Sequence, residues 1–420
     1  MKNIEFIPAP IHGEVRVPSS KSQAHRALIC AALAGNSIVR EVDLSNDITA
    51  TANALKALGA ELCYDSETRV LTVGRALKRG SDAGIIDCGE SGSTLRFLIP
   101  LAAALGNSVT FVGGGRLPKR TTELYKPLLE ANGAKLVYPS NGDFLPLKVS
   151  GELHGGSYSL RGDISSQFVT GLLIALTCVG GDSDISLTTR LESKPYADMT
   201  VDVLRRFGAD IDDTDGYKIR GTRLYPRDFT VEGDCSQAAF FTAAAAINGD
   251  VTLHGINRNT LQGDFKLFDI AARFGAKVEM REDSIRVGSS ELRACEIDAA
   301  DIPDLVPALA VIAAYAEGET RIYNAARLRL KESDRIASTS SLLRQLGADV
   351  SETDDGLIIR GKQRLRGGRV SVAEYNDHRI AMSAAAASVG CTEPVIVDDM
   401  SSINKSYPEF LSDWNAIKQI

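Results

Sequence analysis

A repeat of about 70 residues runs through the whole chain of 420 residues. Six segments rich in Ala, Leu and Ile have the length of a helix, and each ends at a glycine. These closing glycines are 71, 74, 69, 69 and 72 residues apart: Gly35, Gly106, Gly180, Gly249, Gly318 and Gly390. A fixed period of this kind restricts the chain to architectures in which similar supersecondary units pack against one another.

A second, shorter pattern lies between the closing glycines. In each copy a helix ends at a Gly-Ala pair and turns into a strand. The copies are Leu58–Leu62, Asn132–Leu136, Phe207–Ile211, Phe274–Val278 and Leu346–Val350. One unit therefore reads helix, strand, helix, strand, strand, which is typical of an α/β repeat.

The sixth unit shows no such strands before Ile420, whereas two N-terminal strands, Ile4–Ile7 and Glu14–Val17, belong to no unit. We expect both N-terminal strands to complete the sixth unit. The result would be two domains of three units each, one continuous over residues 19–228 and one split between residues 1–18 and 229–420. Two crossings between the domains would form a hinge. A plain stack of repeats without a hinge is the alternative.

Composition excludes several classes of protein. The longest apolar stretch, Leu305–Ala316, is far shorter than the roughly 20 residues of a membrane span, so we expect no membrane insertion. A net charge of -7 argues against a general grip on nucleic acid. No targeting leader is evident, so the cytoplasm is the expected compartment. Seven scattered cysteines without C-x-x-C spacing indicate neither a disulfide framework nor a zinc site.

Polar residues gather where the first helix of each unit should begin. Six equivalent positions lie 13 or 14 residues before the closing glycines: Ser22, Ser93, Ser166, Ser236, Asp304 and Asp377. Ser and Asp are favoured N-caps because their side chains accept hydrogen bonds from free backbone N–H groups. Capping alone accounts for Ser236.

Cations at the same helix starts need another explanation, because a positive side chain in the first turn opposes the helix dipole. These cations are Lys21, Arg26, Arg96 and Arg379. A bound anion removes the conflict. Ser22 and Arg26 are four residues apart on one helix face, so we expect both to reach one phosphate. More cations stand where the second helices of four units should begin: Arg116–Arg120, Lys194, Lys331–Arg335 and Lys405.

Other motifs are weaker taken singly. Gly113–Gly115 is not followed by the Gly-Lys-Ser/Thr of a P-loop. His25 and His378 are either bases or polar caps. No G-x-S-x-G elbow is present, so acyl-transfer hydrolysis has no support.

Seven ordered motifs together resemble the 5-enolpyruvylshikimate-3-phosphate synthase (3-phosphoshikimate 1-carboxyvinyltransferase) family. They are Val17–Ser22 with Arg26, Gly92-Ser93-x-x-Arg96, Ser165–Phe168, Ser193–Tyr196, Ile302–Asp304, Lys331–Arg335 and Tyr375–Arg379. The resemblance extends from residue 15 to beyond residue 405. It implies a two-domain inside-out α/β barrel of six βαβαββ repeats, three per domain, with the substrates held between the domains.

The resemblance also implies a transferase of the shikimate pathway, which leads to chorismate and the aromatic amino acids. Such an enzyme moves the enolpyruvyl group of phosphoenolpyruvate onto the 5-hydroxyl of shikimate 3-phosphate and releases phosphate, without a metal or an organic cofactor. The residues implied for shikimate 3-phosphate are Lys21, Ser22, Arg26, Ser165, Ser166, Gln167, Ser193, Asp304 and Lys331. Those implied for phosphoenolpyruvate are Lys21, Gly92, Arg120, Gln167, Arg335, Arg379 and Lys405. The implied acid–base residues are Asp304, Glu332 and Lys21.

Charge arithmetic agrees with two small anionic substrates. A phosphate carries roughly -1.5 to -2 at neutral pH, and each substrate adds a carboxylate, so the pair presents about -5 to -6. The matching cations are Lys21, Arg26, Arg96, Arg120, Lys331, Arg335, Arg379 and Lys405. We expect Asp304 to take the hydroxyl proton and either Lys21 or Glu332 to protonate the methylene carbon of phosphoenolpyruvate.

Two positions depart from the family's pattern. Glu90 stands where many relatives have Asn, and Arg327 stands where Asn or Glu is common, so Arg327 is left out of the predicted site.

Two rival functions stay open at this point. The sister enolpyruvyl transferase that acts on UDP-N-acetylglucosamine typically begins with a Lys-Asn pair and carries a reactive Cys in a mobile loop. This chain has Lys21-Ser22 instead, and its loop at 113–120 contains no Cys. A non-catalytic anion-binding repeat protein would need neither Asp304 nor Glu332. We expect a monomer with no nucleic-acid partner.

Overall fold

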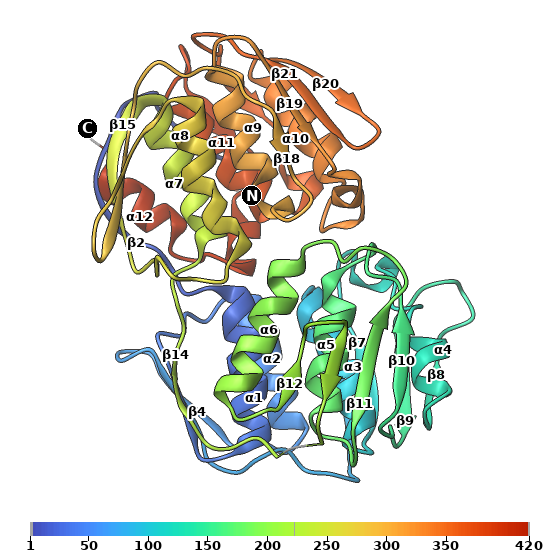
Figure 1. The fold of residues 1–420 in the computed structure, drawn as a ribbon. Coiled ribbons are helices and arrows are strands. Elements are labelled where there is room, and N and C mark those ends of the chain that lie inside the picture. The colour runs from blue at the N-terminus through green and yellow to red at the C-terminus, as the bar shows by residue number, and fades with distance from the viewer. Residues whose placement is uncertain (1–2, 222, 419–420) are drawn as a thin grey trace. The chain divides into compact units, whose positions relative to one another are not determined.

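The computed structural model describes residues 3–221 and 223–418. The chain forms two compact units, which Figure 1 shows as ribbons. The continuous unit is Lys21–Val231, and the split unit combines Met1–Ser20 with Glu232–Ile420. The chain therefore passes from one unit to the other twice, after Ser20 and after Val231.

The continuous unit contains three sheets and the helices between their strands. Its helices are α1 (Lys21–Ala34), α2 (Asn46–Ala57), α3 (Gly92–Ala104), α4 (Tyr125–Glu130), α5 (Ser166–Leu176) and α6 (Lys194–Arg206). The first sheet has the order β14 (Asp228–Thr230), β3 (Ser37–Arg40), β5 (Val70–Val73), β4 (Leu62–Asp65). The second has the order β6 (Asp82–Asp87), β7 (Ser108–Val112), β9 (Leu147–Gly151), β8 (Ala134–Val137). The third has the order β10 (Ser157–Leu160), β11 (Ser183–Leu187), β13 (Tyr217–Ile219), β12 (Ile211–Asp212).

The split unit repeats this plan. Its helices are α7 (Cys235–Asn248), α8 (Lys266–Phe274), α9 (Val306–Tyr315), α10 (Arg335–Gln345), α11 (His378–Ser388) and α12 (Phe410–Ile417). One sheet has the order β16 (Lys277–Met280), β17 (Ser284–Gly288), β15 (Gly249–His254), β2 (Ile11–Arg16). A second has the order β18 (Ile297–Asp298), β19 (Glu319–Tyr323), β21 (Gly356–Arg360), β20 (Asp349–Thr353). A three-stranded sheet has the order β1 (Ile4–Phe6), β23 (Val395–Val397), β22 (Gly368–Val370).

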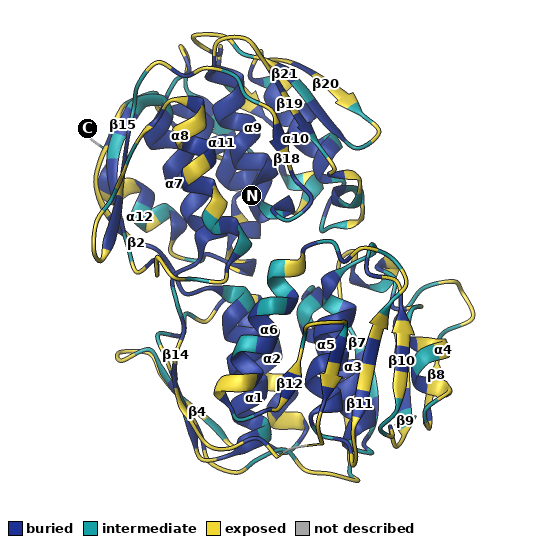
Figure 2. Ribbon diagram, in the orientation of Figure 1, coloured by how far each residue is buried: buried dark blue, intermediate teal, exposed yellow. Residues whose placement is uncertain are grey.

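The first helix of each repeat lies in the interior of its unit. Every residue of α9 and of α11 is buried, and helices that are apolar on all sides belong in a core. Figure 2 shows this buried colour along α7, α9 and α11. The strands instead alternate, as in β10, whose residues are exposed and buried in turn, because one face of each sheet packs on the helices and the other meets water.

The predicted helix ends and starts agree with the structure. The five Gly-Ala glycines have positive φ angles between 91° and 105°: Gly59, Gly133, Gly208, Gly275 and Gly347. A residue in this conformation ends a helix and favours glycine. The first helices begin at or within two residues of the predicted positions, except that a short 3-10 turn, η3 (Pro303–Leu305), precedes α9.

The prediction for the two N-terminal strands was half wrong. β1 pairs with β23 and completes the sixth unit as expected. β2 does not, because it pairs in parallel with β15 of the fourth unit. In the same way β14 pairs in parallel with β3 of the first unit.

The cause lies in the connectivity of the repeat. In the second, third and fifth units the strand that precedes the first helix lies parallel to the strand that follows it: β6 with β7, β10 with β11 and β18 with β19. The strands before α1 and α7 belong to the opposite unit from the helix that follows them. The strands that precede α1 and α7 are therefore exchanged: β2 completes the fourth unit, and β14 completes the first.

The two crossing segments are hydrogen-bonded to each other within the split unit. The Ser20 N–H donates to the Glu232 carbonyl at 2.7 Å, and the Asp234 N–H donates to the Pro18 carbonyl at 2.8 Å. The segment from which the chain leaves the split unit is therefore held by the segment at which it returns.

We expect Gly249→Ala to destabilise the chain through the β2–β15 pair. A Cβ at residue 249 would overlap the Ile11 carbonyl oxygen in β2, although the extended backbone of Gly249 would itself accept alanine. Forcing such an overlap costs about 1–3 kcal/mol, which thermal unfolding should report. The control is Gly180→Ala, where a Cβ meets no atom within 4 Å in the described structure. Equal melting temperatures for the two variants would contradict the assigned pairing.

Candidate functional site

Lys21 begins α1 and is neutralised by an acid from the next helix. Its Nζ lies 2.7 Å from Oδ2 of Asp47, in the first turn of α2, and both side chains are mostly buried. Asp47 is at a favourable helix end, whereas Lys21 is at an unfavourable one. The ion pair therefore keeps a cation at a helix N-terminus.

Arg26 lies one turn further along α1 and is fully engaged by uncharged groups. Its guanidinium donates to Oγ1 of Thr200 at 2.8 Å, to the Tyr196 carbonyl at 2.9 Å and to Oγ1 of Thr170 at 3.2 Å. It also donates to the Ser22 carbonyl at 2.5 Å. Burial lowers the pKa of Arg26 to about 10. Arg26 thus joins α1 to α5 and α6, and its contact with a phosphate remains a prediction.

Gln167 links the starts of α3 and α5. Its Oε1 accepts from Arg96 at 2.6 Å, and its Nε2 donates to Oγ of Ser93 at 3.0 Å. The Arg96 guanidinium also lies 5.1 Å from the centre of the Phe168 ring, a favourable cation–π contact. Two of the predicted motifs therefore meet around one amide.

Gly92 lies directly against the side chain of Arg120. A Cβ at residue 92 would stand 2.8 Å from the guanidinium carbon and both terminal nitrogens of Arg120. Arg120 itself is 9% exposed and follows the 3-10 turn η1 (Leu117–Lys119). Two residues predicted to hold phosphoenolpyruvate are thus in contact.

The serines predicted to bind shikimate 3-phosphate stand at helix starts of the same unit. Ser165 caps α5 by accepting from the Gln167 N–H at 3.3 Å, and Ser166 begins that helix. Ser193 precedes α6 in the left-handed conformation, with φ of 54°. A serine held in this region is uncommon and marks a position fixed by its surroundings.

In the split unit, Arg335 stands at the centre of three carboxylates. Its guanidinium lies 2.8 Å from Oδ2 of Asp377, 2.8 Å from Oδ1 of Asp304 and 2.7 Å from Oε2 of Glu332. Burial opposes the charged form, but these three acids raise the pKa of Arg335 above its ordinary value. Arg335 therefore fixes both predicted acid–base residues of this unit.

Asp304 in turn accepts from three cations. Arg379 reaches its Oδ2 at 3.1 Å and its carbonyl at 3.0 Å, and Lys331 reaches Oδ1 at 3.4 Å, beside the contact from Arg335. Burial raises the pKa of Asp304, but Arg379, Lys331 and Arg335 outweigh burial and hold this pKa well below its usual range. Burial lowers the pKa of Lys331. Asp304 is therefore ionised at neutral pH.

Lys405 completes the predicted residues of the split unit. It ends the 3-10 turn η6 (Ser401–Lys405), and its Nζ donates to the Asn376 carbonyl at 2.5 Å. Asn376 immediately precedes Asp377, the N-cap of α11, which accepts from the Arg379 N–H at 3.0 Å. Lys405, Asp377 and Arg379 thus meet at one helix start.

Sequence reasoning missed or misjudged three acids and a serine. Asp377 was expected only as an N-cap, yet it is the fully buried partner of Arg335. Asp47 and Asp264 were not singled out at all. Ser236 was expected to be explained by capping alone, which was wrong: Asp234 caps α7, and Oγ of Ser236 donates to Asp264 instead. The signal that could have found Asp47 and Asp264 is their place at the second helix starts of units one and four.

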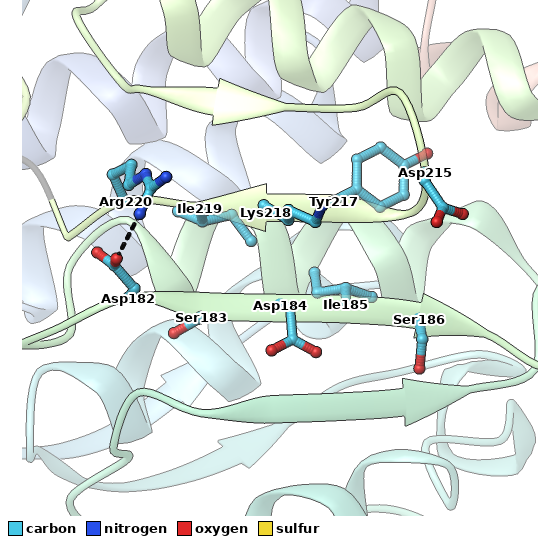
Figure 3. A pocket seen from close by; sticks show the side chains of 10 residues that line it. All are labelled: Asp182, Ser183, Asp184, Ile185, Ser186, Asp215, Tyr217, Lys218, Ile219 and Arg220. Atoms are coloured by element: carbon cyan, nitrogen blue, oxygen red, sulfur yellow. Dashed lines mark hydrogen bonds and ion pairs between the residues drawn. The ribbon is translucent and has the colours of Figure 1, made fainter.

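One groove of the described structure lies apart from the predicted site. This groove crosses β11 and β13, as Figure 3 shows, and none of the predicted site residues lines it. Its Asp182–Arg220 ion pair is largely exposed and so of little energetic value. Within residues 3–221 and 223–418, no three His, Cys, Asp or Glu side chains cluster as metal ligands would, and no helix has the length and apolar character of a membrane span.

Comparison with known proteins decides the family. The sequence profile of the EPSP synthase (3-phosphoshikimate 1-carboxyvinyltransferase) family matches residues 6–414. The chain belongs to this family. Its fold is accordingly the two-domain inside-out α/β barrel of EPSP synthase, as the sequence motifs implied.

Individual members of the family resemble the chain over its full length. The 3-phosphoshikimate 1-carboxyvinyltransferase of Clostridium novyi (strain NT) is 43% identical over 429 residues, which cover 99% of this chain and 98% of that one. Its counterpart from Clostridium kluyveri is 43% identical and covers 99% and 97%. The structure of EPSP synthase from Acinetobacter baumannii superimposes with a TM-score of 0.82 at 26% identity, covering 100% of this chain and 98% of that one.

We expect the stability of the chain to depend on pH because of Asp264. Burial, then the charges of Asp304 and Asp234, raise the pKa of Asp264 to about 6, against the opposing effects of Ser236 and Arg379. Between pH 4 and pH 6 the folded chain therefore binds more protons at this group than the unfolded chain does, so stability falls as pH rises through that window. Asp264→Asn should remove this loss, worth about 2 kcal/mol.

Thermal unfolding at pH 4.5 and pH 7.5 tests this expectation. The Asp264→Asn variant should gain stability relative to the native chain at the higher pH. The control is Asp269→Asn on the exposed face of α8, which should follow the native chain at both values. A pH-independent difference between Asp264→Asn and the native chain would contradict the argument.

Proposed function

We propose that this chain transfers the enolpyruvyl group of phosphoenolpyruvate to the 5-hydroxyl of shikimate 3-phosphate and releases phosphate. The family assignment supports this reaction. The observation that carries the chemistry is the arrangement in the split unit, where Asp304 and Glu332 both contact a buried Arg335. Acids and cations at these helix starts are the groups that proton transfer between anionic substrates requires.

The proposed binding residues are divided between the two units. For shikimate 3-phosphate they are Lys21, Ser22, Arg26, Ser165, Ser166, Gln167 and Ser193 of the continuous unit with Asp304 and Lys331 of the split unit. For phosphoenolpyruvate they are Lys21, Gly92, Arg120 and Gln167 of the continuous unit with Arg335, Arg379 and Lys405 of the split unit. The contacts Gln167–Ser93, Gly92–Arg120 and Arg379–Asp304 support these assignments, because each joins predicted residues from separate stretches of the sequence.

Three proton transfers are needed. In the addition, the shikimate hydroxyl loses a proton as it attacks the C2 carbon of phosphoenolpyruvate, and the methylene carbon gains one to become a methyl group. In the elimination, the methyl group of the tetrahedral adduct gives a proton back as the C–O bond to phosphate breaks, which restores the vinyl group and releases phosphate. We propose Asp304 as the base, because it is ionised and stands at a helix start. Lys21 or Glu332 supplies the proton to carbon.

The cations around Asp304 explain how substrate binding would prepare it. A base works best when its pKa lies near the working pH, whereas Arg379, Lys331 and Arg335 hold the pKa of Asp304 far below that. The carboxylate and phosphate of the substrates are anions that compete for the same cations. Drawing Arg379 or Lys331 away from Asp304 raises the pKa of Asp304, so the base gains strength only when substrate is bound.

We also propose that the enzyme acts in the cytoplasm as a monomer. All seven cysteines are free thiols, as is usual in a reducing compartment.

Phosphate release tests the reaction and its rivals together. We expect the chain to release inorganic phosphate from phosphoenolpyruvate only when shikimate 3-phosphate is present. Release with UDP-N-acetylglucosamine as the acceptor would assign the chain to the sister reaction. Binding of both shikimate-pathway substrates without release would favour the non-catalytic reading.

Asp304→Asn tests the proposed base. We expect kcat to fall by about 10²–10⁴-fold, the usual contribution of a general base, while steady-state phosphate release measures the loss. Circular dichroism and thermal unfolding confirm that the variant is folded. The matched control is Asp301→Asn three residues earlier, whose carboxylate faces Lys266 at 3.3 Å on the surface. Unchanged turnover in folded Asp304→Asn would remove Asp304 from the mechanism.

A further inference from the structure

A line of buried hydrogen bonds inside the continuous unit connects three helices. Nδ1 of His25 on α1 lies 2.8 Å from Oγ1 of Thr51 on α2, which lies 2.6 Å from Oγ1 of Thr94 on α3. Thr94 Oγ1 lies 2.7 Å from Oγ of Ser91, the N-cap of α3. All four side chains are at most 1% exposed. The hydrogen-bond line is therefore shielded from water along its length.

The direction of every hydrogen bond in this line follows from the number of protons available. Thr94 has one hydroxyl proton, which it donates to Ser91 Oγ at 2.7 Å or to the Asp47 carbonyl at 3.5 Å. Because that proton is used, Thr94 accepts the hydrogen bond from Thr51, and this bond uses the single hydroxyl proton of Thr51. Thr51 must in turn accept from His25. The order of donation is His25 to Thr51 to Thr94 to Ser91.

The surroundings of His25 agree with that order. Its Nε2 is buried and makes no hydrogen bond within residues 3–221 and 223–418. An unprotonated Nε2 that accepts no hydrogen bond costs less free energy at a buried site than an N–H group that donates none. Buried N–H groups without a partner are rare in native structures. Burial, then the charges of Lys21 and Arg26, hold the pKa of His25 well below its ordinary value. The ring is therefore neutral and carries its proton on Nδ1.

The two ends of the line lie beside residues of the proposed phosphoenolpyruvate set. Lys21 is one turn before His25 on the same face of α1 and is paired with Asp47. At the other end, Ser91 immediately precedes Gly92, against which Arg120 packs. The hydrogen-bond line therefore spans from the start of α1 to the start of α3.

We propose that His25, as its Nδ1–H tautomer, together with Thr51 and Thr94, positions the start of α1 against the start of α3 and so sets the spacing between Lys21 and Gly92 for phosphoenolpyruvate. These are positioning residues, because they act through Lys21 and Gly92. The inference rests on the proposed function, since its kinetic effect is defined for that substrate.

Nitrogen NMR tests the tautomer in the native chain. Among the five histidines, selective ¹⁵N labelling of the imidazoles and comparison with His25→Gln identify the His25 signals. We expect a neutral ring protonated on Nδ1, with no titration between pH 6 and pH 8. A ring protonated on Nε2, or one that titrates in this range, would overturn the proposed order of donation.

Paired substitutions test the positioning role by kinetics. Thr51→Val and Thr94→Val keep the shape of the side chain but remove the hydroxyl, whereas Thr51→Ser and Thr94→Ser keep the hydroxyl. We expect the valine variants to raise the KM for phosphoenolpyruvate about three- to tenfold, the value of one net hydrogen bond. The KM for shikimate 3-phosphate and kcat should change less, and the serine variants should restore the native KM.

A buried threonine outside the line provides the matched control. Thr177 is 2% exposed and donates to the Ile174 carbonyl of its own helix, so Thr177→Val should lower the melting temperature without raising the KM. If His25, Thr51 and Thr94 had a purely structural role, their variants would also lower the melting temperature without raising the KM for phosphoenolpyruvate. That result would overturn the proposal. Failure of the proposed function would instead appear as absent phosphate release in the native chain, with the NMR result unaffected.

Discussion

The cluster of charged side chains at the helix starts of the split unit depends on one fully buried ion pair, Arg335 with Asp377. Its two atoms are 2.8 Å apart, and neither side chain is more than 2% exposed. A buried charge is costly unless it is paired and hydrogen-bonded, and Asp377 meets that condition by also accepting from Ser333 and from the first turn of α11. Because Asp377 holds one side of the guanidinium, the other side is fixed in the direction of Asp304 and Glu332.

The continuous unit handles its buried cations differently. Arg26 is surrounded by hydroxyls and backbone carbonyls, which satisfy its donors without cancelling its charge. Only Lys21 of this pair has a carboxylate partner, Asp47. The region around the starts of α1, α5 and α6 therefore keeps positive charge that a phosphate can neutralise, whereas the split unit stores acids beside its cations. The first arrangement suits binding, and the second suits proton transfer.

Particular residues show which features of the fold the sequence predicted and which it did not. The repeat predicted the helix starts, because a Gly-terminated helix of constant length fixes where the helix must begin. The repeat did not predict the partner of β2, because that partner depends on which unit the next helix enters. The local pattern of Glu14–Val17 would be the same in either sheet. The repeat also failed for Ser236, because the choice between Asp234 and Ser236 as N-cap depends on where Asp264 lies, and Asp264 is 28 residues further along the chain.

The acids at the second helix starts show how one repeated position takes opposite charges. Four units carry cations there, but the first carries Asp47 and the fourth carries Asp264. In the first unit the first helix supplies its own cation, Lys21, so an acid is the residue that balances it. In the fourth unit the nearby cation is Arg379 of the sixth, whose charge lowers the pKa of Asp264 although burial raises it. For Asp264 the matching cation therefore comes from another repeat, and a pattern read along a single unit does not contain that neighbour.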